Sequence, residues 1–415
     1  MPQVFVFIGL LIFAAHLFAF IFSRKRVPDV LFLMAIGILV GPVLHLVSFH
    51  GGGRYASLFG SLTLLFILFD SGVDMRIDSI RRYWKGVVQV ALSSYLISVF
   101  TVMSITMALL SFDWLEGCLM GTIVSGTAAA VVIPLVVQMR VSEKTRTTLI
   151  LESALSGVMS IVFTLALVEA LHMGSVNVLS VSARLLYSFI VSSIIGIVGG
   201  VVWAGLLEKV RRLKNSMFLT PAFLFLLFGL AEYVGQSGSI AALSFGIVLG
   251  NTNYFDFSFL HRYGSFQMVP LSKNEKSFFK EIVFVLKTVF FVYIGICIPF
   301  NNVTSLLYGL AIALGLFAVR FLLVFIVGRK NTFNDRLTVS VMIPKGLVSA
   351  VLASVPLEIN HRLGYQVVPH AAMIASVTYA VIFFSIVLTS LLVLLTSRRL
   401  VKDEMVEWKE EYNYE

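Results

Sequence analysis

The chain consists of long runs of apolar residues, separated by short segments that hold nearly all of its charged side chains. A transmembrane helix needs about 20 consecutive, predominantly apolar residues. By this criterion the sequence predicts thirteen spans, at residues 2–22, 29–48, 58–73, 86–112, 115–139, 147–171, 185–207, 217–234, 237–251, 279–300, 304–327, 337–357 and 367–396. Because backbone groups that face lipid must be satisfied internally, we predict an all-α polytopic membrane protein of about thirteen transmembrane helices.

The basic residues between the spans predict the orientation of the chain. The segments on one side of the predicted membrane, which begin with Arg24–Arg26 and end with the tail, hold 25 of the 31 lysines and arginines. The segments on the other side hold three, Arg54, Arg184 and Arg362. Cytoplasmic loops carry such an excess of positive charge. We therefore expect the plasma (inner) membrane, an external N-terminus and a cytoplasmic C-terminus.

The composition excludes a soluble multidomain protein. Of the 415 residues 58% are hydrophobic and 13% are charged, against about 45–50% and about 25% in soluble domains. The net charge of +9 lies mostly in the predicted cytoplasmic loops, so we expect the lipid bilayer and no nucleic acid as a partner. Cys118 and Cys297 lie in apolar runs without metal-ligand spacing. The P-loop, HExxH, CxxC and GxSxG motifs are absent, and we expect no enzyme activity, cofactor or metal site.

Two predicted spans contain residues that break helices. The fifth reads GTIVSGTAAAVVIPLV, with Gly126 and Pro134, and the twelfth reads VMIPKGLVSAVLASVP, with Pro344 and Gly346. Proline removes a backbone donor and glycine weakens a helix, so both spans are predicted to unwind. The two lie seven spans apart and therefore run in opposite directions. Interrupted helices in corresponding positions of inverted halves indicate a secondary-transporter site, although kinks at small-residue packing interfaces would leave the same pattern.

A few ionisable residues fall inside the predicted spans, where they are costly and are usually functional or paired. The acidic candidates are Asp70, at the cytoplasmic end of the third span, and Glu152 in the sixth. The basic candidates are Lys287, Arg320 and Lys345. We predict that Glu152 and these basic residues form a buried charge network. For Glu152 a structural role and an ion-handling role both remain open.

Several motifs resemble segments of the cation:proton antiporter superfamily, in particular the NhaP-type sodium/proton exchangers. They are LFDSGVDM (68–75), SGTAAAVVIP (125–134), LESALSG (151–157), SGSIAALSFGIVLGN (237–251), KSFFKEIVFVLKTVFFVYIGI (276–296) and IPKGLVSAVLASVP (343–356). The likeness is collinear over most of the chain. It implies an inverted-repeat antiporter fold in which the unwound spans 5 and 12 cross. It also implies a homodimer and an elevator-like transport movement.

The resemblance further implies a division of the chain into functional parts. The dimerisation spans are 1–3 (residues 1–75) and 8–10 (217–300), and the transport-bundle spans are 4–6 (86–171) and 11–13 (304–396). A linking span occupies 185–207. Residues 397–415 form a short acidic cytoplasmic tail, which is expected either to be simply solvated or to dock a protein partner.

The chain departs from the family pattern at two positions. Thr-Asp-Pro of the family's fifth span reads Thr127, Ala128 and Ala129, and Asn-Asp of its sixth span reads Ser156 and Gly157. Both aspartates that bind the cation and exchange protons in the family are therefore replaced. The remaining candidate ion ligands are Asp70, Thr127, Ser153, Ser156 and Glu152. The resemblance places Glu152 opposite Lys345, which stands where the family has arginine.

Two functions are compatible with this sequence. The first is a monovalent cation (Na⁺ or K⁺)/proton antiporter in which Asp70 or Glu152 is the protonatable ligand, because exchange requires a site whose charge changes with proton occupancy. The second is an antiporter-fold protein without coupled exchange. That protein would be a uniporter or channel-like pore, a carrier of an anion or neutral solute, or a regulated membrane subunit.

Overall fold

The computed structural model describes residues 9–17, 29–45, 53–139, 141–173, 178–214, 216–255, 268–327 and 332–412. Within these ranges every regular element is a helix. Residues 9–17 are helical. The further helices are α2 (Asp29–Ile38), η1 (Leu39–Val43), α3 (Gly53–Asp74), α4 (Ile77–Leu110), α5 (Trp114–Ser125), α6 (Ala129–Gln138), α7 (Glu143–Met173), α8 (Val178–Arg211), η2 (Ser216–Phe218), α9 (Leu219–Tyr233), α10 (Gly238–Gly250), α11 (Thr252–Phe255), α12 (Lys273–Cys297), α13 (Val303–Val327), α14 (Phe333–Val341), α15 (Leu347–Leu363) and α16 (Ala371–Tyr412).

The apolar runs predicted from the sequence are helical in the structure. Among the described residues, seven segments are long and apolar enough to cross a membrane: Lys85–Leu110, Trp114–Ile133, Glu143–Val168, Tyr187–Arg211, Ser216–Tyr233, Val303–Ile326 and Ala371–Thr396. Other predicted spans coincide with α2 and η1, α3, α10, α12, and α14 with α15. Of the predicted first span, only 9–17 lies within the described residues. The predicted helical membrane architecture is confirmed, and the count of thirteen stays a prediction.

The chain divides into two compact units. The first unit comprises residues 1–54, 85–168 and 288–415, and the second comprises 55–84 and 169–287. Nearly all of the expected transport-bundle residues, in spans 4–6 and 11–13, fall in the first unit. Spans 1 and 2 fall in the first unit as well, whereas the third span belongs to the second unit.

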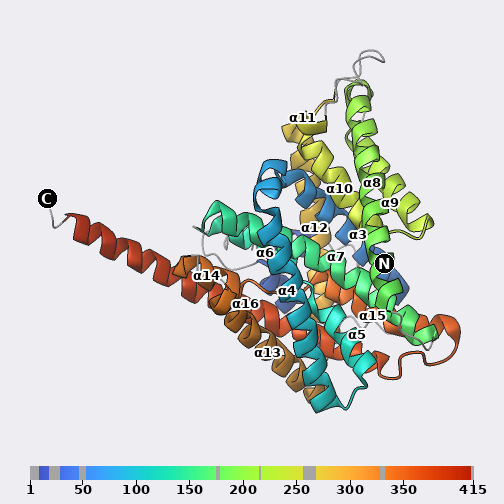
Figure 1. The fold of residues 1–415 in the computed structure, drawn as a ribbon, viewed down its shortest axis with the longest axis vertical. Helices are drawn as coiled ribbons and strands as arrows, with labels where there is room; N and C mark the ends of the chain where they lie inside the picture. The colour runs from blue at the N-terminus through green and yellow to red at the C-terminus, as the bar shows by residue number, and fades with distance from the viewer. Residues whose placement is uncertain are drawn as a thin grey trace. The chain divides into compact units, whose positions relative to one another are not determined.

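Close backbone contacts at glycine organise the second unit. A Cβ atom on Gly246 of α10 would lie 2.2 Å from the carbonyl oxygen of Phe69 in α3, so only glycine fits there. Gly196 of α8 approaches the carbonyl of Ala241 in α10 equally closely. Small residues let helices associate closely within a membrane. In Figure 1, α8, α9 and α10 accordingly run beside one another.

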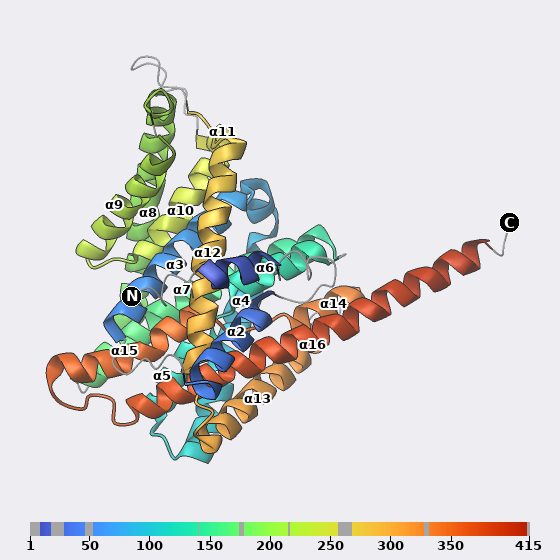
Figure 2. The same ribbon diagram turned by 180° about the vertical axis from the view of Figure 1, so that it is seen from behind.

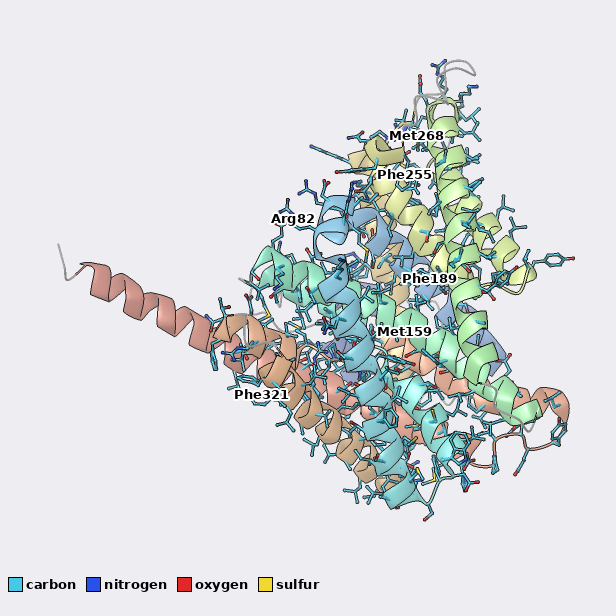
Figure 3. The ribbon with its side chains drawn as sticks, in the orientation of Figure 1. Arg82, Met159, Phe189, Phe255, Met268 and Phe321 are labelled. Atoms are coloured by element: carbon cyan, nitrogen blue, oxygen red, sulfur yellow. The ribbon has the colours of Figure 1, made fainter. Side chains whose placement is uncertain are left out.

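The first unit is built around α13 and α16, which pack along each other (Figure 2). They approach closely at Gly309 of α13, where a Cβ atom would lie 2.4 Å from the Cβ of Ala380 in α16. The opposite side of α13 carries exposed apolar side chains such as Phe321, which points away from the neighbouring helices in Figure 3. An exposed apolar face of this kind suits contact with lipid tails.

A capping box starts α12. The Ser272 hydroxyl accepts a hydrogen bond from the amide of Glu275, and the Glu275 carboxylate accepts one from the amide of Ser272 at 2.7 Å. Arg211 at the end of α8 binds both carboxylate oxygens of Glu275, at 3.2 and 2.6 Å. Burial by itself raises the pKa of Glu275, but the hydrogen bonds from Arg211 and Ser272 outweigh it and hold that pKa below its usual value.

Candidate functional site at the two helix breaks

The fifth predicted span is interrupted near its middle. Helix α5 ends at Ser125, Gly126 and Ala128 have extended backbones, and α6 begins at Ala129. The expectation that Pro134 also breaks this span is wrong, because Pro134 lies inside α6. Proline removes one main-chain bond, but here the helix continues on both sides of it. The break therefore lies at the small residues before Pro134, from Gly126 to Ala128.

The twelfth predicted span is interrupted in the same manner. Helix α14 ends at Val341, residues 342–346 are non-helical, and α15 begins at Leu347. Pro344 and Gly346 both lie within this break. Proline has no backbone N–H, and a non-helical segment does not need one for a helical hydrogen bond. The unwinding of spans 5 and 12 predicted from the sequence is thus present in the fold.

The two breaks cross each other in direct contact. The amide of Ala128 donates a hydrogen bond of 2.7 Å to the carbonyl oxygen of Pro344. A Cβ atom on Gly346 would lie 2.8 Å from the Cβ of Ala128, so glycine is needed for the two chains to come this close. Unwound backbone at membrane depth must be satisfied by protein or water, and here each break satisfies part of the other.

Side chains satisfy further backbone groups at the crossing. The Lys345 ammonium donates to the carbonyl of Ser125, the last residue of α5, at 2.9 Å. The Ser385 hydroxyl of α16 accepts the amide of Lys345 at 2.9 Å. In the same way the Ser156 hydroxyl of α7 accepts the amide of Thr127 at 3.0 Å, and it donates to the carbonyl of Ser153 at 3.3 Å. The two broken helices, α5–α6 and α14–α15, thus meet α7 and α16 at one polar centre inside the first unit.

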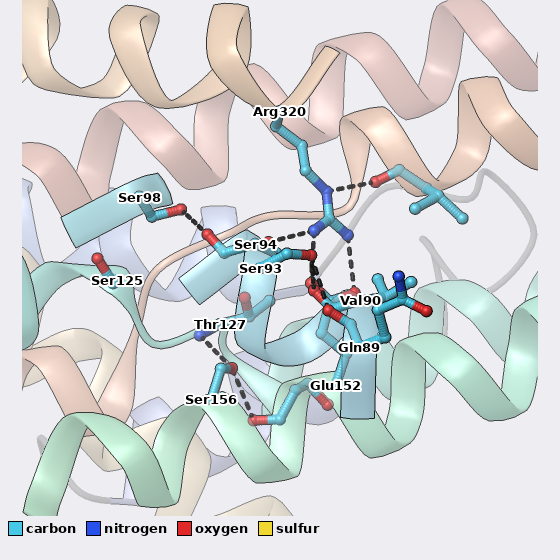
Figure 4. A network of polar contacts seen from close by, with 12 residues as sticks. Gln89, Val90, Ser93, Ser94, Ser98, Ser125, Thr127, Glu152, Ser156 and Arg320 are labelled. Carbon is cyan, nitrogen blue, oxygen red and sulfur yellow. Dashed lines mark hydrogen bonds and ion pairs between the residues drawn. The ribbon is translucent and has the colours of Figure 1, made fainter. Parts of the chain in front are cut away.

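A buried ion pair lies beside this centre (Figure 4). Arg320 of α13 binds both carboxylate oxygens of Glu152 in α7, at 2.5 and 2.7 Å. The same guanidinium also donates to the Ser94 hydroxyl of α4 and, at 3.1 Å, to the Val339 carbonyl of α14. Both charged side chains are less than 5% exposed. A planar guanidinium matches a carboxylate with two parallel bonds.

The expected pairing of Glu152 with Lys345 is therefore corrected. Glu152 is bound by Arg320, and the Lys345 ammonium reaches a backbone carbonyl instead. Glu152 pairs with Arg320 rather than with Lys345 because a guanidinium can donate to both carboxylate oxygens at once, which a single ammonium does less well. The network that we expected thus contains one closed ion pair, and Lys345 lies outside it.

The remaining predicted site residues belong to the second unit. Asp70 is half-buried in the last turns of α3, one turn before Asp74, which forms an ion pair with Lys280 at 3.4 Å. Lys287 is buried, with its ammonium 5.9 Å from the ring centroid of Phe284. By contrast, Thr127, Ser153, Ser156 and Glu152 are brought together in the first unit.

Sequence reasoning missed a second buried carboxylate in the first unit. Glu116, in the first turn of α5, is 4% exposed. It accepts hydrogen bonds from the amide and the ring Nδ1 of His370, with contacts between 2.9 and 3.3 Å. The two residues are 254 positions apart, and each lies next to a predicted span boundary, where solvation is the ordinary expectation. Only the fold brings them together.

A polytopic helical protein with two broken helices crossing at a buried polar centre has the architecture of a secondary transporter. The family model described as "Sodium/hydrogen exchanger, transmembrane" matches residues 9–398. The chain therefore belongs to the sodium/hydrogen exchanger family, a family of multi-pass membrane transporters. The predicted resemblance to cation:proton antiporters is confirmed.

Individual relatives agree with this family. The chain is 26% identical to Na(+)/H(+) antiporter 1 of Methanocaldococcus jannaschii over 374 residues, which cover 84% of this chain and 82% of the relative. It is 32% identical over 242 residues to the K(+)/H(+) antiporter NhaP2 of Shewanella sp. strain ANA-3, covering 55% of this chain and 40% of that protein. The electron-microscopy structure of the M. jannaschii sodium proton antiporter MjNhaP1 matches with a TM-score of 0.74 at 25% identity, covering 97% of this chain and 98% of that one.

Proposed function

We propose that the chain is a monovalent cation/proton antiporter of the plasma membrane that exchanges Na⁺ or K⁺ for protons. The observation that carries this proposal is the contact between the two broken helices, where the amide of Ala128 binds the carbonyl of Pro344 inside a polar centre. Family membership, together with relatives named as Na(+)/H(+) and K(+)/H(+) antiporters, supports the same function. Transport rather than chemical conversion of a substrate is the activity that this proposal assigns.

The cation would be held by oxygen atoms beside the break in α5–α6. The proposed ligands are the hydroxyl oxygens of Thr127, Ser153 and Ser156. Thr127 and Ser156 are neighbours, because the Thr127 amide donates to the Ser156 hydroxyl, and Ser153 lies one turn before Ser156 on α7. Hydroxyl and carbonyl oxygens are suitable ligands for hard cations. Asp70 of α3 belongs to the second unit and is proposed as a separate protonatable carboxylate of the transporter. The charge of Glu152 is neutralised by Arg320, so Glu152 acts as a structural support of the site.

The exchange itself is tested in proteoliposomes with an internal pH-sensitive dye. Addition of Na⁺, K⁺ or Li⁺ outside is expected to drive protons out of the vesicles. Ser156→Ala removes a hydroxyl at the break and is expected to weaken the response to cation at least about fivefold, which corresponds to the loss of about one hydrogen bond. The matched control is Ser354→Ala, since the Ser354 hydroxyl binds only a carbonyl of its own helix α15 among the described residues.

The outcomes separate coupled exchange from its alternative. Absence of any proton movement with all three cations between about pH 6 and pH 9 would contradict the proposal. A cation conductance without proton movement would favour an uncoupled pore on the antiporter fold instead. The replacement of the two family aspartates by Ala128 and Gly157 is the observation that makes this second function worth testing.

Further parts of the proposal concern assembly and orientation. We propose a homodimer in which spans 1–3 and 8–10 form the contact between subunits. The distribution of lysine and arginine between the predicted loops supports an external N-terminus and a cytoplasmic C-terminus. Cysteine labelling from either side of intact cells, with one cysteine placed in the loop near Arg54 and another near Arg336, tests this orientation.

A further inference from the structure

Lys345 is the charged side chain in the break between α14 and α15, and it is 1% exposed. Its ammonium donates to the Ser125 carbonyl at 2.9 Å. An ammonium has three donors, and no other hydrogen bond or ion pair is formed by this group within the described part of the chain. The Lys345 ammonium therefore lies at the crossing of the two broken helices. Among the described residues its direct partner is a carbonyl oxygen and not a carboxylate.

The neighbouring charges leave that cation uncompensated. Arg320, from α13, repels the Lys345 ammonium, and Glu152, from α7, attracts it. Because Arg320 binds both oxygens of Glu152, these two charges sum to zero. Among the described residues, the partners of Lys345 on α5 and α16 are uncharged: the Ser125 carbonyl accepts from the ammonium, and the Ser385 hydroxyl accepts from the main-chain amide. A single positive charge without its own counter-ion is a costly state in a dry interior.

Lysine differs from arginine in one property that matters here. A buried lysine can give up its proton and become a neutral amine, whereas a guanidinium stays charged under all conditions in proteins. Cation/proton exchange requires one group at the site whose charge changes with proton occupancy. In the first unit the Glu152 carboxylate is ion-paired with Arg320, and positions 128 and 157 carry alanine and glycine, which do not titrate. Lys345 is therefore the group at the crossing whose charge can change with proton occupancy.

We infer that Lys345 is the proton-exchanging residue of this antiporter, with its ammonium and the transported cation occupying the crossing alternately. This inference rests on the proposed function and names the group that couples it. The charged ammonium repels a cation from the Thr127–Ser156 region. When Lys345 loses its proton, the neutral amine no longer repels, and one Na⁺ or K⁺ enters.

The step balances in charge and atoms. The N–H bond of the ammonium breaks, its electron pair stays on nitrogen, and the proton leaves to water on the side to which the site is open. One monovalent cation takes the place of one proton, so the site carries the same total charge before and after. Exchange by this mechanism is one to one and electroneutral, and a membrane potential does not drive it.

The test uses the full-length protein, purified and reconstituted, with three variants. Lys345→Arg keeps the positive charge but replaces the ammonium by a guanidinium, which does not release its proton. Lys345→Met removes the charge. Lys280→Arg is the control, because it makes the same chemical change at a lysine that is more than half exposed. We measure cation-driven proton flux in proteoliposomes. In detergent we measure the increase in Tm caused by Na⁺, K⁺ or Li⁺ against choline at equal ionic strength, since a ligand of the folded state raises Tm.

The expected results differ in kind between the variants. Wild type and Lys280→Arg exchange ions, and the cation-induced increase in Tm grows as the pH is raised from about 6 to about 9. Lys345→Arg loses at least about tenfold in flux, and cations raise its Tm little at any pH. Lys345→Met also loses coupled flux, but its Tm response to cations no longer depends on pH, which a purely structural role for Lys345 would not produce.

Four results would overturn the inference in different ways. If wild type moves no protons with any of the three cations, the proposed function fails and the role of Lys345 fails with it. If wild type is active and Lys345→Arg exchanges ions with an unchanged pH profile, only the role of Lys345 fails. A flux that responds to a K⁺-valinomycin potential would also contradict the electroneutral step. In a further variant, Asp70→Asn, loss of the pH dependence that the Lys345 variants retain would assign the proton to Asp70.

Discussion

The amide of Ala128 and the carbonyl of Pro344, 216 residues apart in the sequence, are joined by a hydrogen bond of 2.7 Å. This bond connects the broken helix α5–α6 to the broken helix α14–α15 through main-chain atoms alone. Around it the Lys345 ammonium satisfies the Ser125 carbonyl, and the Ser156 hydroxyl satisfies the Thr127 amide. The local structure of both breaks and the proposed ion chemistry therefore depend on the same few atoms.

Space at the crossing predicts opposite effects for two glycine substitutions. Gly346→Ala would place a Cβ atom 2.8 Å from that of Ala128, and overpacking of this kind costs about 1–3 kcal/mol. Gly157→Ala meets only Val348, at 3.4 Å, and removes a helix-weakening glycine, which is worth up to about 1 kcal/mol. Thermal unfolding in detergent should show a lower Tm for the first variant and an equal or higher Tm for the second. Equal losses in both would contradict the close approach.

The buried ion pair predicts strong coupling between Glu152 and Arg320. Removing either partner leaves the other charge buried and unpaired, so Glu152→Gln and Arg320→Gln should each cost about 3–5 kcal/mol. The double variant should cost clearly less than the sum of the two. Unfolding in mixed detergent measures all four proteins. Additive losses would show that the two side chains do not interact in the folded protein.

The capping box predicts how stability depends on pH at the start of α12. A carboxyl group whose pKa is lower in the folded than in the unfolded protein adds stability above its unfolded value of about 4.3, and this contribution disappears as the pH falls through the folded value. Because the pKa of Glu275 is lowered, the Tm difference between wild type and Glu275→Gln should be largest near neutral pH. It should shrink as the solution is made more acidic than about pH 4.

A control separates this effect from the loss of the cap. Ser272→Ala removes the hydroxyl that accepts the Glu275 amide but leaves the carboxylate and Arg211 in place, at a cost of about 0.5–2 kcal/mol. Its Tm difference from wild type should change less with pH than that of Glu275→Gln. A Glu275→Gln difference that stays constant from neutral to acidic pH would contradict the lowered pKa.

The pair of Glu116 and His370 predicts a stabilising contact between the first turn of α5 and the start of α16. Glu116→Ala leaves two donors of His370 without their acceptor, and such a loss costs about 1–3 kcal/mol. Glu116→Gln retains an acceptor oxygen and should cost less. Hydrogen–deuterium exchange should then report faster exchange in residues 370–374 for the alanine variant. Equal exchange in all three proteins would mean that Glu116 does not hold this end of α16.

The sequence predicted the architecture because its signals are local and strong. Apolar runs define where helices cross a membrane, and the small residues around Gly126 and the Pro344–Gly346 segment mark where two of them unwind. Local propensity does not predict the position of a break: Pro134 is a stronger helix breaker than Gly126 in isolation, yet it lies inside α6. Tertiary contacts at Ala128, which no local pattern encodes, decide the position.

Partner choice was the part that sequence could not supply. Glu152 had three basic candidates within predicted spans, and the geometry of the guanidinium favours Arg320. Ser94, Ser385 and the Val339 carbonyl complete the surroundings, but a serine in an apolar run or a backbone carbonyl has no signature of its own. Contacts over more than 200 residues, such as that from Lys345 to Ser125, follow from the crossing and are not readable before it is known.

The hydrogen bond from Ala128 to Pro344 uses no side-chain atom, and this has an evolutionary consequence. Residues at position 128 can be exchanged without removing the bond that holds the two breaks together, as long as the side chain fits beside Gly346. The chemistry of the ion site can then diverge by single substitutions while the scaffold around it is inherited intact. A lineage could in this way lose its carboxylates, change the group that carries the proton, and keep the same architecture throughout.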